Sequence, residues 1–213
     1  MDLLQGAYTY FLNNQADFWQ TFQEHLVLVS VAMGISLGIG LPLGILIAHR
    51  ANLAQVVINI FNTFRVIPSL AILFLALPYL GLGFLPSLVA LTVLAFPPVL
   101  INTYAGLRGV EKAVIEVAYG MGMSTSQVLR RVEIPLAVPS VVTGIRVAAV
   151  EVISSATLAA FIGGGGLGNY ITRGFALYDV SIMLVGAIPV AMLALSSEIF
   201  WALFLKFYQA RAV

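Results

Sequence analysis

Four long runs of apolar residues decide what this chain can fold into. They cover approximately residues 26–48, 84–107, 136–162 and 180–205. Each is long enough for the helix of about 20 residues that crosses the hydrocarbon core of a bilayer. Because 61% of the residues are hydrophobic and only 9% are charged, the composition is far from that of a soluble domain. In lipid every backbone polar group needs an internal partner, so the runs predict an all-α integral membrane protein.

A fifth run, near residues 56–80, is more polar than the other four. It contains Asn59, Asn62, Arg65 and Pro68. Proline has no backbone N–H and disrupts a helix interior. We therefore expect about five spans, of which this one is polar on one side and kinked or broken near Pro68. That break makes Pro68 a candidate hinge.

The basic residues orient the bundle, because cytoplasmic loops carry the excess of Lys and Arg. If five spans alternate, nearly all basic loop residues fall on one side, and Arg173 falls on the other with several acids. The N-terminus is therefore expected outside and the C-terminus inside. The residues on the basic side are Arg50, Arg108, Lys112, Arg130, Arg131, Lys206 and Arg211, and the acids on the other are Asp2, Asp17, Glu24 and Asp179.

Residues 1–24 are expected to form an outer interfacial segment of a single transmembrane domain that covers residues 1–213. They contain no basic n-region and no small-residue cleavage pattern close to the first span, so we do not expect a removable signal peptide. Phe18, Trp19 and Phe22 lie at helical spacing just before that span. An aromatic belt at the membrane–water interface explains them better than a ligand cage does.

Residues 108–135 lie on the cytoplasmic side in this assignment and are too patterned for a plain connector. Apolar residues recur at intervals of three and four between Glu111 and Tyr119, which predicts a short helix. Gly120 and Gly122 then interrupt the pattern, and they allow a turn that larger residues adopt only at a cost. We expect the first helix of this loop to end in a glycine elbow.

A second short helix is expected after the elbow. Ser124 and Gln127 have the S-x-x-Q spacing of a capping box, so this helix should begin near Thr125. Pro135 should end it. Its basic face would also suit a helix that lies on lipid headgroups. Periodicity alone does not separate that alternative from a helix pair that binds another protein.

The order of acidic, small, glycine, aliphatic and proline residues in this loop resembles the EAA loop of permease subunits in ATP-binding cassette importers. That motif runs E-A-A, three residues, G, nine residues, I-x-L-P, and Val117 stands here for its second alanine. The resemblance implies that the loop docks in a groove of a separate ATPase subunit and couples the two. The residues expected at this coupling site are Glu116, Ala118, Gly120, Gly122, Met123, Ser124, Val132, Ile134 and Pro135.

Segments outside the loop resemble the osmoprotectant branch of these permeases, whose members import glycine betaine, carnitine, choline or proline betaine. They are "HLVLVSVAMGISLGIGLPLGIL", "RVIPSLA", "FPPVLINTYAGLRGV" and "ATLAAFIGGGGLG". The piece "NTYAGLRGV" is the most specific to the branch. Methionine-type permeases carry similar glycines, so a permease of the same fold for another small solute, such as methionine, stays the alternative.

The resemblance also implies the partners and the location of the chain. It implies a type I, methionine-permease-like fold in a bacterial cell membrane, a second permease subunit that is identical or a sister chain, ATPase subunits, and an extracytoplasmic solute-binding protein. The chain itself lacks a G-x-x-x-x-G-K-[ST] loop. We therefore expect a non-catalytic subunit that binds no cofactor, with ATP and Mg²⁺ on the ATPase. A net charge of +1 gives no reason to expect nucleic acid as a partner.

Glycines gather at the outer end of the fourth span. Missing side chains there allow close backbone approach and easy changes of φ and ψ. The run could form an outer gate, a docking site for the solute-binding protein, or a plain turn. A phosphate-binding role is not expected, because no Lys-Ser/Thr pair follows. The candidate gate residues are Gly163, Gly164, Gly165, Gly166 and Gly168.

Charged residues inside the spans are costly and usually mark function or a buried pair. Arg146 and Glu151 are five residues apart, so they do not pair on one helix face. Arg65 and Arg146 are expected to snorkel toward the cytoplasmic end, whereas Glu198 could reach a partner on another helix. Glu151 is the deepest, and we hypothesise that it faces the translocation path or a dimer interface, where it would favour a cationic solute.

Aromatic residues would suit a quaternary ammonium solute through cation–π attraction. Tyr79, Phe96, Tyr104 and Phe161 are the candidates, although packing or lipid contact explains most aromatics in such a chain. The resemblance places the high-affinity aromatic cage in the separate binding protein. The sequence therefore names no firm substrate ligand.

Two other classes of protein fit the sequence less well. A secondary transporter commonly has internal repeats and more spans than five. A membrane enzyme would need a carboxylate pair, a His/Cys cluster or a serine nucleophile motif, and the sequence provides none at a membrane face. The chain has no cysteine, and His25 and His49 lie at opposite ends of one span, so no metal site is expected.

Overall fold

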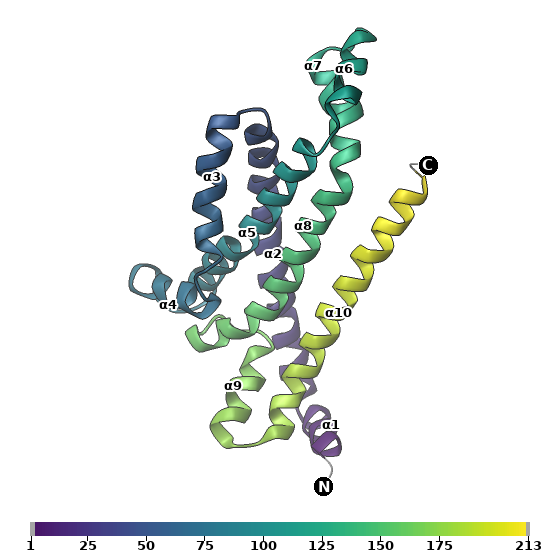
Figure 1. The fold of residues 1–213 in the computed structure, drawn as a ribbon. Helices are drawn as coiled ribbons and strands as arrows, with labels where there is room; N and C mark the ends of the chain where they lie inside the picture. Colours follow the sequence, from purple (N-terminus) through teal and green to yellow (C-terminus); the bar gives the residue numbers. More distant parts are fainter. Residues whose placement is uncertain (1–2, 212–213) are drawn as a thin grey trace.

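The computed structural model describes residues 3–211 as helices joined by short turns (Figure 1). Asp2, one of the acids used for the orientation, lies outside the described residues, as does the side chain of Arg211. The helices in chain order are α1 (Leu3–Asn13), α2 (Gln15–Ala48), α3 (Ala51–Phe64), α4 (Ser69–Leu80), α5 (Phe84–Arg108), α6 (Lys112–Gly120), α7 (Thr125–Val128), a π-helical turn (Leu129–Glu133), α8 (Ile134–Ser155), a 3-10 helix (Ala156–Ile162), α9 (Gly168–Leu177) and α10 (Val180–Arg211).

The predicted all-α membrane fold is confirmed. Four helical stretches in the described part of the chain are long and apolar enough to cross a bilayer: α2, α5, the continuous run Thr125–Ile162, and α10. Helices α3 and α4 form a fifth candidate span, bent by 94° between Phe64 and Ser69. Pro68 is the N-cap residue of α4, so the break lies where the sequence predicted it.

Helices α2, α5 and α8 pack together in the centre of the bundle. Their shared core contains mainly aliphatic and alanine side chains, including Leu28, Leu91, Val99, Ala148 and Val152. Glycines let the backbones approach closely, as is usual between membrane helices. A Cβ atom at Gly44 of α2 would lie 2.7 Å from Cβ of Thr103 on α5. A Cβ at Gly144 of α8 would lie 2.6 Å from the Pro98 carbonyl oxygen on α5.

The two ends of the bundle carry different structures (Figure 1). Helices α6 and α7 project from one end, which we call the hairpin end, and α1, α9 and the N-terminus lie at the other, which we call the α9 end. The hairpin end carries three basic residues at helix ends, namely Arg50, Arg108 and Lys112, whereas Arg173 lies in α9 at the other end. The same separation of basic residues was used to predict the orientation of the bundle in the membrane. Which end faces the cytoplasm stays a prediction.

Three boundaries differ from the sequence prediction. Helix α2 begins at Gln15, so the aromatic residues before the expected first span belong to the same helix as the span. Residues 163–179, expected to be a loop, contain α9. Pro135 does not end the second loop helix, because it lies in the first turn of α8 and the helical run continues to Ile162. A proline is tolerated in the first turn of a helix, where its missing N–H would have no helical partner.

Candidate coupling hairpin and glycine loop

Helices α6 and α7 form a compact hairpin that we call the α6–α7 hairpin (residues 112–128; Figure 1). Helix α6 covers Lys112–Gly120 with Glu111 at its N-cap, close to the predicted helix. Within it, Ala118 is 4% exposed and Val128 of α7 is 1% exposed. Each arm of the hairpin therefore carries a buried side chain.

The elbow between the two helices has the hydrogen bonds of a Schellman motif. The Gly122 N–H donates to the Tyr119 carbonyl at 2.9 Å, and the Met123 N–H donates to the Ala118 carbonyl at 3.2 Å. Gly122 has a φ of 82°, in the left-handed region that favours glycine. Gly120 belongs to the last turn of α6, so the expectation that both glycines interrupt the helix is wrong for Gly120.

The predicted capping box at the start of α7 is confirmed. Ser124 is the N-cap residue, and both reciprocal contacts with Gln127 are present. The Ser124 N–H donates to Gln127 Oε1 at 2.8 Å. These local contacts satisfy backbone donors that the helix itself leaves unpaired, and they fix the angle between the two arms.

The tip of the α6–α7 hairpin exposes apolar side chains. Val117 is 62% exposed, Met121 is 73% exposed, and Tyr119 is half-exposed. Glu116 and Ser124 are exposed beside them. An exposed apolar group with a polar rim is typical of a protein-binding surface. The signal in the sequence was the spacing of four residues between Val117 and Met121, which puts side chains on one face of a helix.

The last three motif residues belong to the base of the hairpin. Val132, Ile134 and Pro135 are half-buried. Ile134 packs against a cluster that contains Ala48 of α2 and Leu107 of α5. The nine predicted coupling residues are therefore divided between a partly exposed hairpin and a packed base where the hairpin enters the bundle.

The glycine loop (residues 163–167) lies at the other end, between the 3-10 helix and α9. Gly163, Gly165 and Gly166 have φ values of 74°, 76° and 83°, which side chains of L-residues rarely adopt. The Gly83 N–H donates to the Ile162 carbonyl at 2.7 Å and joins this loop to the turn before α5. The loop therefore depends on its glycines for its conformation, and the choice between a gate, a docking site and a plain turn stays open.

Glu24 of α2 holds the glycine loop from the opposite side. Its Oε2 accepts a hydrogen bond from the Gly166 N–H at 3.2 Å, and its Oε1 accepts one from Gln20 Nε2 at 3.1 Å. A hollow of about 520 Å³ opens here, and the residues that line it are Gln20, Gln23, Glu24, Val27, Phe84, Gly163, Gly164 and Gly165. Glu24 was expected only as one of the acids on the outer side, because nothing local in the sequence indicates this contact.

His25 lies directly beneath the glycine loop. It is fully buried, and within the described part of the chain neither of its ring nitrogens has a hydrogen-bond partner. A Cβ atom at Gly166 would lie 3.1 Å from His25 Nδ1. The imidazole and the loop backbone are therefore in direct contact, so Gly166 is required for space as well as for its φ angle.

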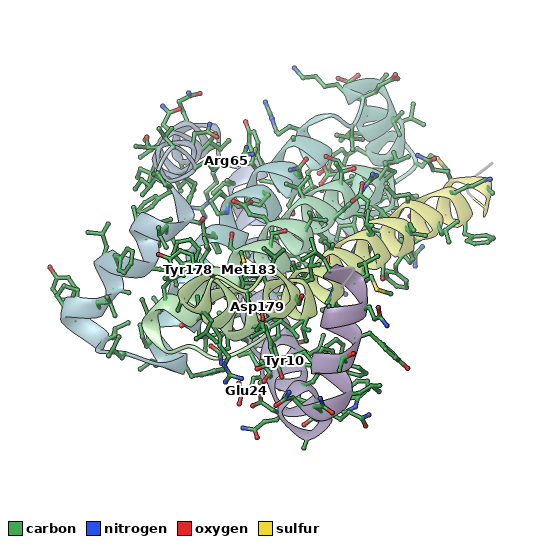
Figure 2. All side chains as sticks on the ribbon, turned by 90° about the horizontal axis from the view of Figure 1, so that it is seen from below. Tyr10, Glu24, Arg65, Tyr178, Asp179 and Met183 are labelled. Atoms are coloured by element: carbon green, nitrogen blue, oxygen red, sulfur yellow. The ribbon has the colours of Figure 1, made fainter. Side chains whose placement is uncertain are left out.

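Helix α9 is held to α2 and α1 by a polar cluster. The Tyr170 hydroxyl donates to Asp17 Oδ2 at 2.9 Å, and Arg173 Nη1 lies 3.4 Å from the same oxygen. Arg173 also donates to the Tyr10 hydroxyl at 3.3 Å. Burial, followed by the hydrogen bond to Asp17, raises the pKa of Tyr170 above its usual range. In the view from below, Tyr10 and Glu24 lie on the side of the N-terminal helices, and Arg65 lies apart near α3 (Figure 2).

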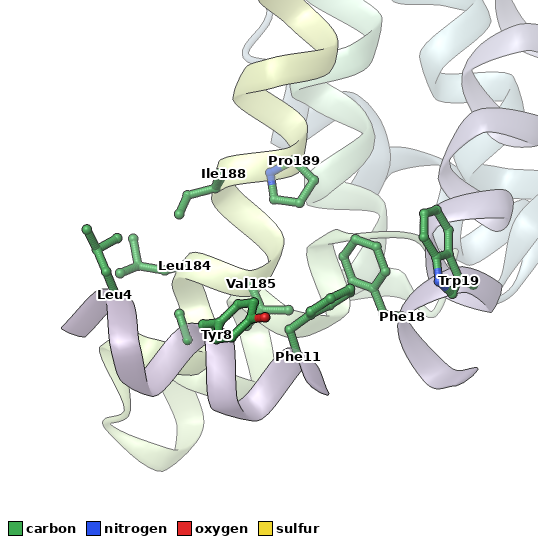
Figure 3. A pocket seen from close by; sticks show the side chains of 10 residues that line it. Leu4, Tyr8, Phe11, Phe18, Trp19, Leu184, Val185, Ile188 and Pro189 are labelled. Atoms are coloured by element: carbon green, nitrogen blue, oxygen red, sulfur yellow. The ribbon is translucent and has the colours of Figure 1, made fainter. Parts of the chain in front are cut away.

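The aromatic residues before the first expected span have two roles. Phe18 is 7% exposed and packs edge-on against Phe11 of α1, with ring centroids 4.8 Å apart. Trp19 is 54% exposed. These side chains border an apolar hollow of about 320 Å³ between α1, α2 and α10 (Figure 3), and the others that line it are Leu4, Ala7, Tyr8, Leu184, Val185, Ile188 and Pro189. Phe18 is thus a packing residue, whereas Trp19 retains the exposure expected of an interfacial belt.

Two of the charges within the spans pair with each other. Arg146 of α8 forms an ion pair with Glu198 of α10, so the expectation that Glu198 reaches another helix is confirmed. Arg146, which was expected to snorkel, thus has a carboxylate partner on a neighbouring helix. Glu151 lines the same hollow of about 510 Å³ as this pair, together with Thr143 and Ser154. Among the described residues Glu151 is in no ion pair.

The aromatic candidates for a quaternary ammonium solute lie in different surroundings. Phe96 is buried and packs on Phe61 with centroids 4.7 Å apart, which is the packing role expected for most aromatics. Tyr104 borders the same cluster. Tyr79 is 86% exposed and Phe161 is 56% exposed.

Comparison with known proteins gives consistent matches over most of the chain. Residues 40–208 match the family model described as "Binding-protein-dependent transport system inner membrane component". The chain is 42% identical to a carnitine transport permease protein, OpuCB, of Listeria monocytogenes, over 92% of this chain and 89% of the relative. It is 40% identical to a glycine betaine/carnitine/choline transport system permease protein, OpuCB, of Bacillus subtilis, over 88% of this chain and 86% of the relative.

The fold also matches a solved structure. A chain of the MetNI methionine ABC transporter, in an inward-facing conformation, superposes with a TM-score of 0.81. The match covers 90% of this chain and 95% of that chain at 23% sequence identity. At this identity the likeness establishes the arrangement of helices and leaves the solute open.

Proposed function

The chain belongs to the family of binding-protein-dependent transport system inner membrane components, and we propose that it is a permease subunit that imports osmoprotectants with energy from ATP. The solutes are glycine betaine, carnitine, choline or related quaternary ammonium compounds. Two relatives that are 40–42% identical to this chain are permeases for carnitine and for glycine betaine, carnitine and choline, and they support this solute class. The methionine transporter structure shares only 23% of its residues with this chain, so we favour osmoprotectants.

The observation that carries the proposal is the α6–α7 hairpin. Its Gly122 elbow and its Ser124–Gln127 capping box give it a fixed shape, and it exposes apolar side chains at its tip. A rigid projection with an exposed apolar tip is suited to insertion into a groove of another protein. We assign this groove to a separate ATPase subunit, which would bind ATP and Mg²⁺, and we assign no catalytic role to this chain.

Transport in this proposal is alternating access driven from the hairpin end. Two permease subunits pair in a bacterial cell membrane, with the hairpin end in the cytoplasm, and each offers its hairpin to one ATPase. Closure of the ATPases moves the hairpins, and the spans rock between inward-facing and outward-facing arrangements. Residues 1–213 act as one transmembrane domain, in which residues 108–135 are the cytoplasmic coupling loop and residues 1–24 are the outer interfacial segment.

The glycine loop is proposed as the outer gate, on the side where an extracytoplasmic solute-binding protein delivers the solute. Its three glycines with positive φ allow conformations closed to other residues, and Glu24 holds one of them from α2. Gly164 and Gly168 complete the tight packing of this segment, and Pro68 is a second candidate hinge. Glu151, in the hollow between α8 and α10, is proposed to face the solute path or the second permease subunit.

The test is to isolate the tagged chain with its partners from its native host, identify the other subunits, and reconstitute the complex in vesicles with its binding protein. We expect ATP-dependent uptake of labelled glycine betaine, carnitine or choline that excess methionine does not reduce. ATP-dependent uptake of methionine would select the alternative solute. Uptake that continues without ATP or without the ATPase would contradict the proposal.

A further inference from the structure

The base of the α6–α7 hairpin is connected to α2 by one polar pair. Glu133, in the π-helical turn, is 8% exposed, and a buried carboxylate is costly unless it is paired. Its Oε2 lies 2.8 Å from Nε2 of His49. His49 is the C-cap residue of α2, so the pair joins the base of the hairpin to the end of the first span.

The second nitrogen of His49 fixes the direction of the ring. Nδ1 lies 3.0 Å from the Ile45 carbonyl oxygen, one of the carbonyls left without a helical donor at the end of α2. A carbonyl and an ionised carboxylate both accept hydrogen bonds, and the imidazolium form of histidine donates from both nitrogens. This arrangement suits a charge-assisted contact to Glu133, which is stronger than a neutral one.

A second contact connects the same base to α10. The Tyr208 hydroxyl donates to the Pro135 carbonyl oxygen at 3.0 Å. In a regular α-helix that carbonyl would accept from the N–H four residues later, but residue 139 is a proline and has none. Tyr208 therefore supplies the hydrogen bond that Pro139 removes from α8.

The contacts lie where the hairpin joins the bundle. The π-helical turn Leu129–Glu133 separates α7 from α8, and such turns are rare in helices and frequent at functional sites. Around it, Leu129 and Ile134 pack against Ala48, Leu107 and Ala137 of α2, α5 and α8. A movement of the hairpin therefore meets a packed base with polar contacts to two further helices.

We propose that the His49–Glu133 and Tyr208–Pro135 contacts pass movement of the α6–α7 hairpin to α2 and α10. Glu133, His49 and Tyr208 are then positioning residues for coupling, and none of them needs to touch the ATPase. Arg130 and Arg131 beside Glu133 are exposed, so they are available to a partner while Glu133 faces the bundle. The inference rests on the proposed coupling function.

The experiment measures solute uptake and ATP hydrolysis in the same vesicles and compares their ratio between variants. We expect Tyr208→Phe, which removes one hydroxyl, to lower the uptake per ATP by about fivefold, the effect of one neutral hydrogen bond. We expect Glu133→Gln to lower it by about tenfold, because the uncharged amide can form only a weaker, neutral hydrogen bond with His49. Association of the ATPase should be unchanged in both variants.

Matched controls separate coupling from general damage. Tyr8→Phe removes a hydroxyl from a side chain that is 63% exposed, and Arg50→Gln removes a charge next to His49 at an exposed position. Both should keep the wild-type ratio. The exchange variant His49→Glu with Glu133→His should recover part of the ratio that Glu133→Gln loses. A simple defect of folding would not give that recovery.

Two outcomes would overturn the inference. One is a wild-type ratio in both Glu133→Gln and Tyr208→Phe, and the other is a lower ratio that is fully explained by loss of the ATPase. If the wild-type complex shows no ATP-driven uptake, the proposed function fails, and spin-label distances still test the contacts. The chain has no native cysteine, so labels on Ser126→Cys and Leu46→Cys report the hairpin relative to α2. Their distance distribution should broaden with Glu133→Gln, and an unchanged distribution contradicts the connection.

Discussion

The carboxylate of Glu24 accepts a hydrogen bond from the backbone N–H of Gly166 at 3.2 Å, across 142 positions of the sequence. A side chain of α2 thereby holds the glycine loop, which follows the 3-10 helix after α8. Gly166 has a φ of 83° and rests against His25. The conformation of the glycine loop therefore depends on α2 as well as on its own residues.

Removing the Glu24 carboxylate should loosen the glycine loop. With Glu24→Ala the Gly166 N–H loses its acceptor, and a hydrogen bond to a charged group contributes about 1.5–3 kcal/mol. We expect amide hydrogen exchange in residues 163–168 to become faster by about tenfold or more. Gln23→Ala, at the exposed neighbouring position, is the control and should exchange like the wild type. Equal exchange in the Glu24→Ala variant and the wild type would show that Glu24 does not hold the loop.

The two glycines of the hairpin should respond in opposite directions to alanine. Gly122 has a φ of 82°, where a Cβ atom costs about 1–2 kcal/mol, although the space around it is open. Gly120 is helical, and alanine there should gain about 0.5–1 kcal/mol. We expect Gly122→Ala to weaken ATPase co-purification and uptake, Gly122→Trp to abolish uptake without preventing membrane insertion, and Gly120→Ala to retain both. Normal ATPase binding and transport by Gly122→Trp would remove the hairpin from the coupling site.

The Arg146–Glu198 pair should show strong coupling between its two members. Arg146→Met or Glu198→Leu alone leaves an unpaired charge within the spans, whereas the double variant leaves none. We expect each single variant to unfold at a lower temperature than the double variant in thermal denaturation of the purified protein. Additive effects of the two substitutions would mean that the pair contributes no interaction energy.

The contact between Tyr170 and Asp17 predicts an alkaline loss of stability. Because the folded pKa of Tyr170 is raised, its contribution is present below the unfolded tyrosine pKa of about 10 and is lost as the pH rises above that value. Tyr170→Phe should lower the free energy of unfolding by about 1 kcal/mol at neutral pH. Above pH 10 this variant should lose less stability than the wild type does. Denaturant unfolding between pH 7 and pH 11 measures both. If the stability of the two proteins changed with pH in the same way, the contribution of Tyr170 at this contact would be contradicted.

Glu151 is the residue with which to test the solute path. If its carboxylate faces a cationic solute, Glu151→Gln should raise the concentration for half-maximal uptake of choline or carnitine while ATP hydrolysis stays close to the wild-type rate. Thr143→Val, in the same hollow, changes polarity without charge and serves as the comparison. An unchanged affinity in Glu151→Gln removes Glu151 from the path and leaves the subunit interface as its surroundings.

The features that the sequence predicted well are those that local interactions determine. The Gly122 elbow and the Ser124–Gln127 box are closed by residues a few positions apart, and the break near Pro68 follows from proline chemistry. Pro135 was misjudged because a proline is compatible with both the end and the first turn of a helix, and packing at the base decides between them. Helix α9 was missed because tertiary contacts through Tyr170 and Arg173 hold it in place.

The sequence did not predict the partners in the contacts that connect distant segments, although it suggested that Glu198 would reach another helix. Glu24 with Gly166, His49 with Glu133, and Arg146 with Glu198 join residues separated by 142, 84 and 52 positions. Each involves a residue type whose usual role at a membrane protein surface is solvation or snorkelling. Only the packing of α2, α8 and α10 brings their partners within reach.

The π-helical turn at Leu129–Glu133 places one surplus residue in the helical run between α7 and α8. One residue corresponds to about 100° of rotation around a helix axis. A single extra amino acid therefore sets the direction in which the hairpin points around the helix axis. A one-codon deletion there would point the same intact hairpin toward a different side of the molecule.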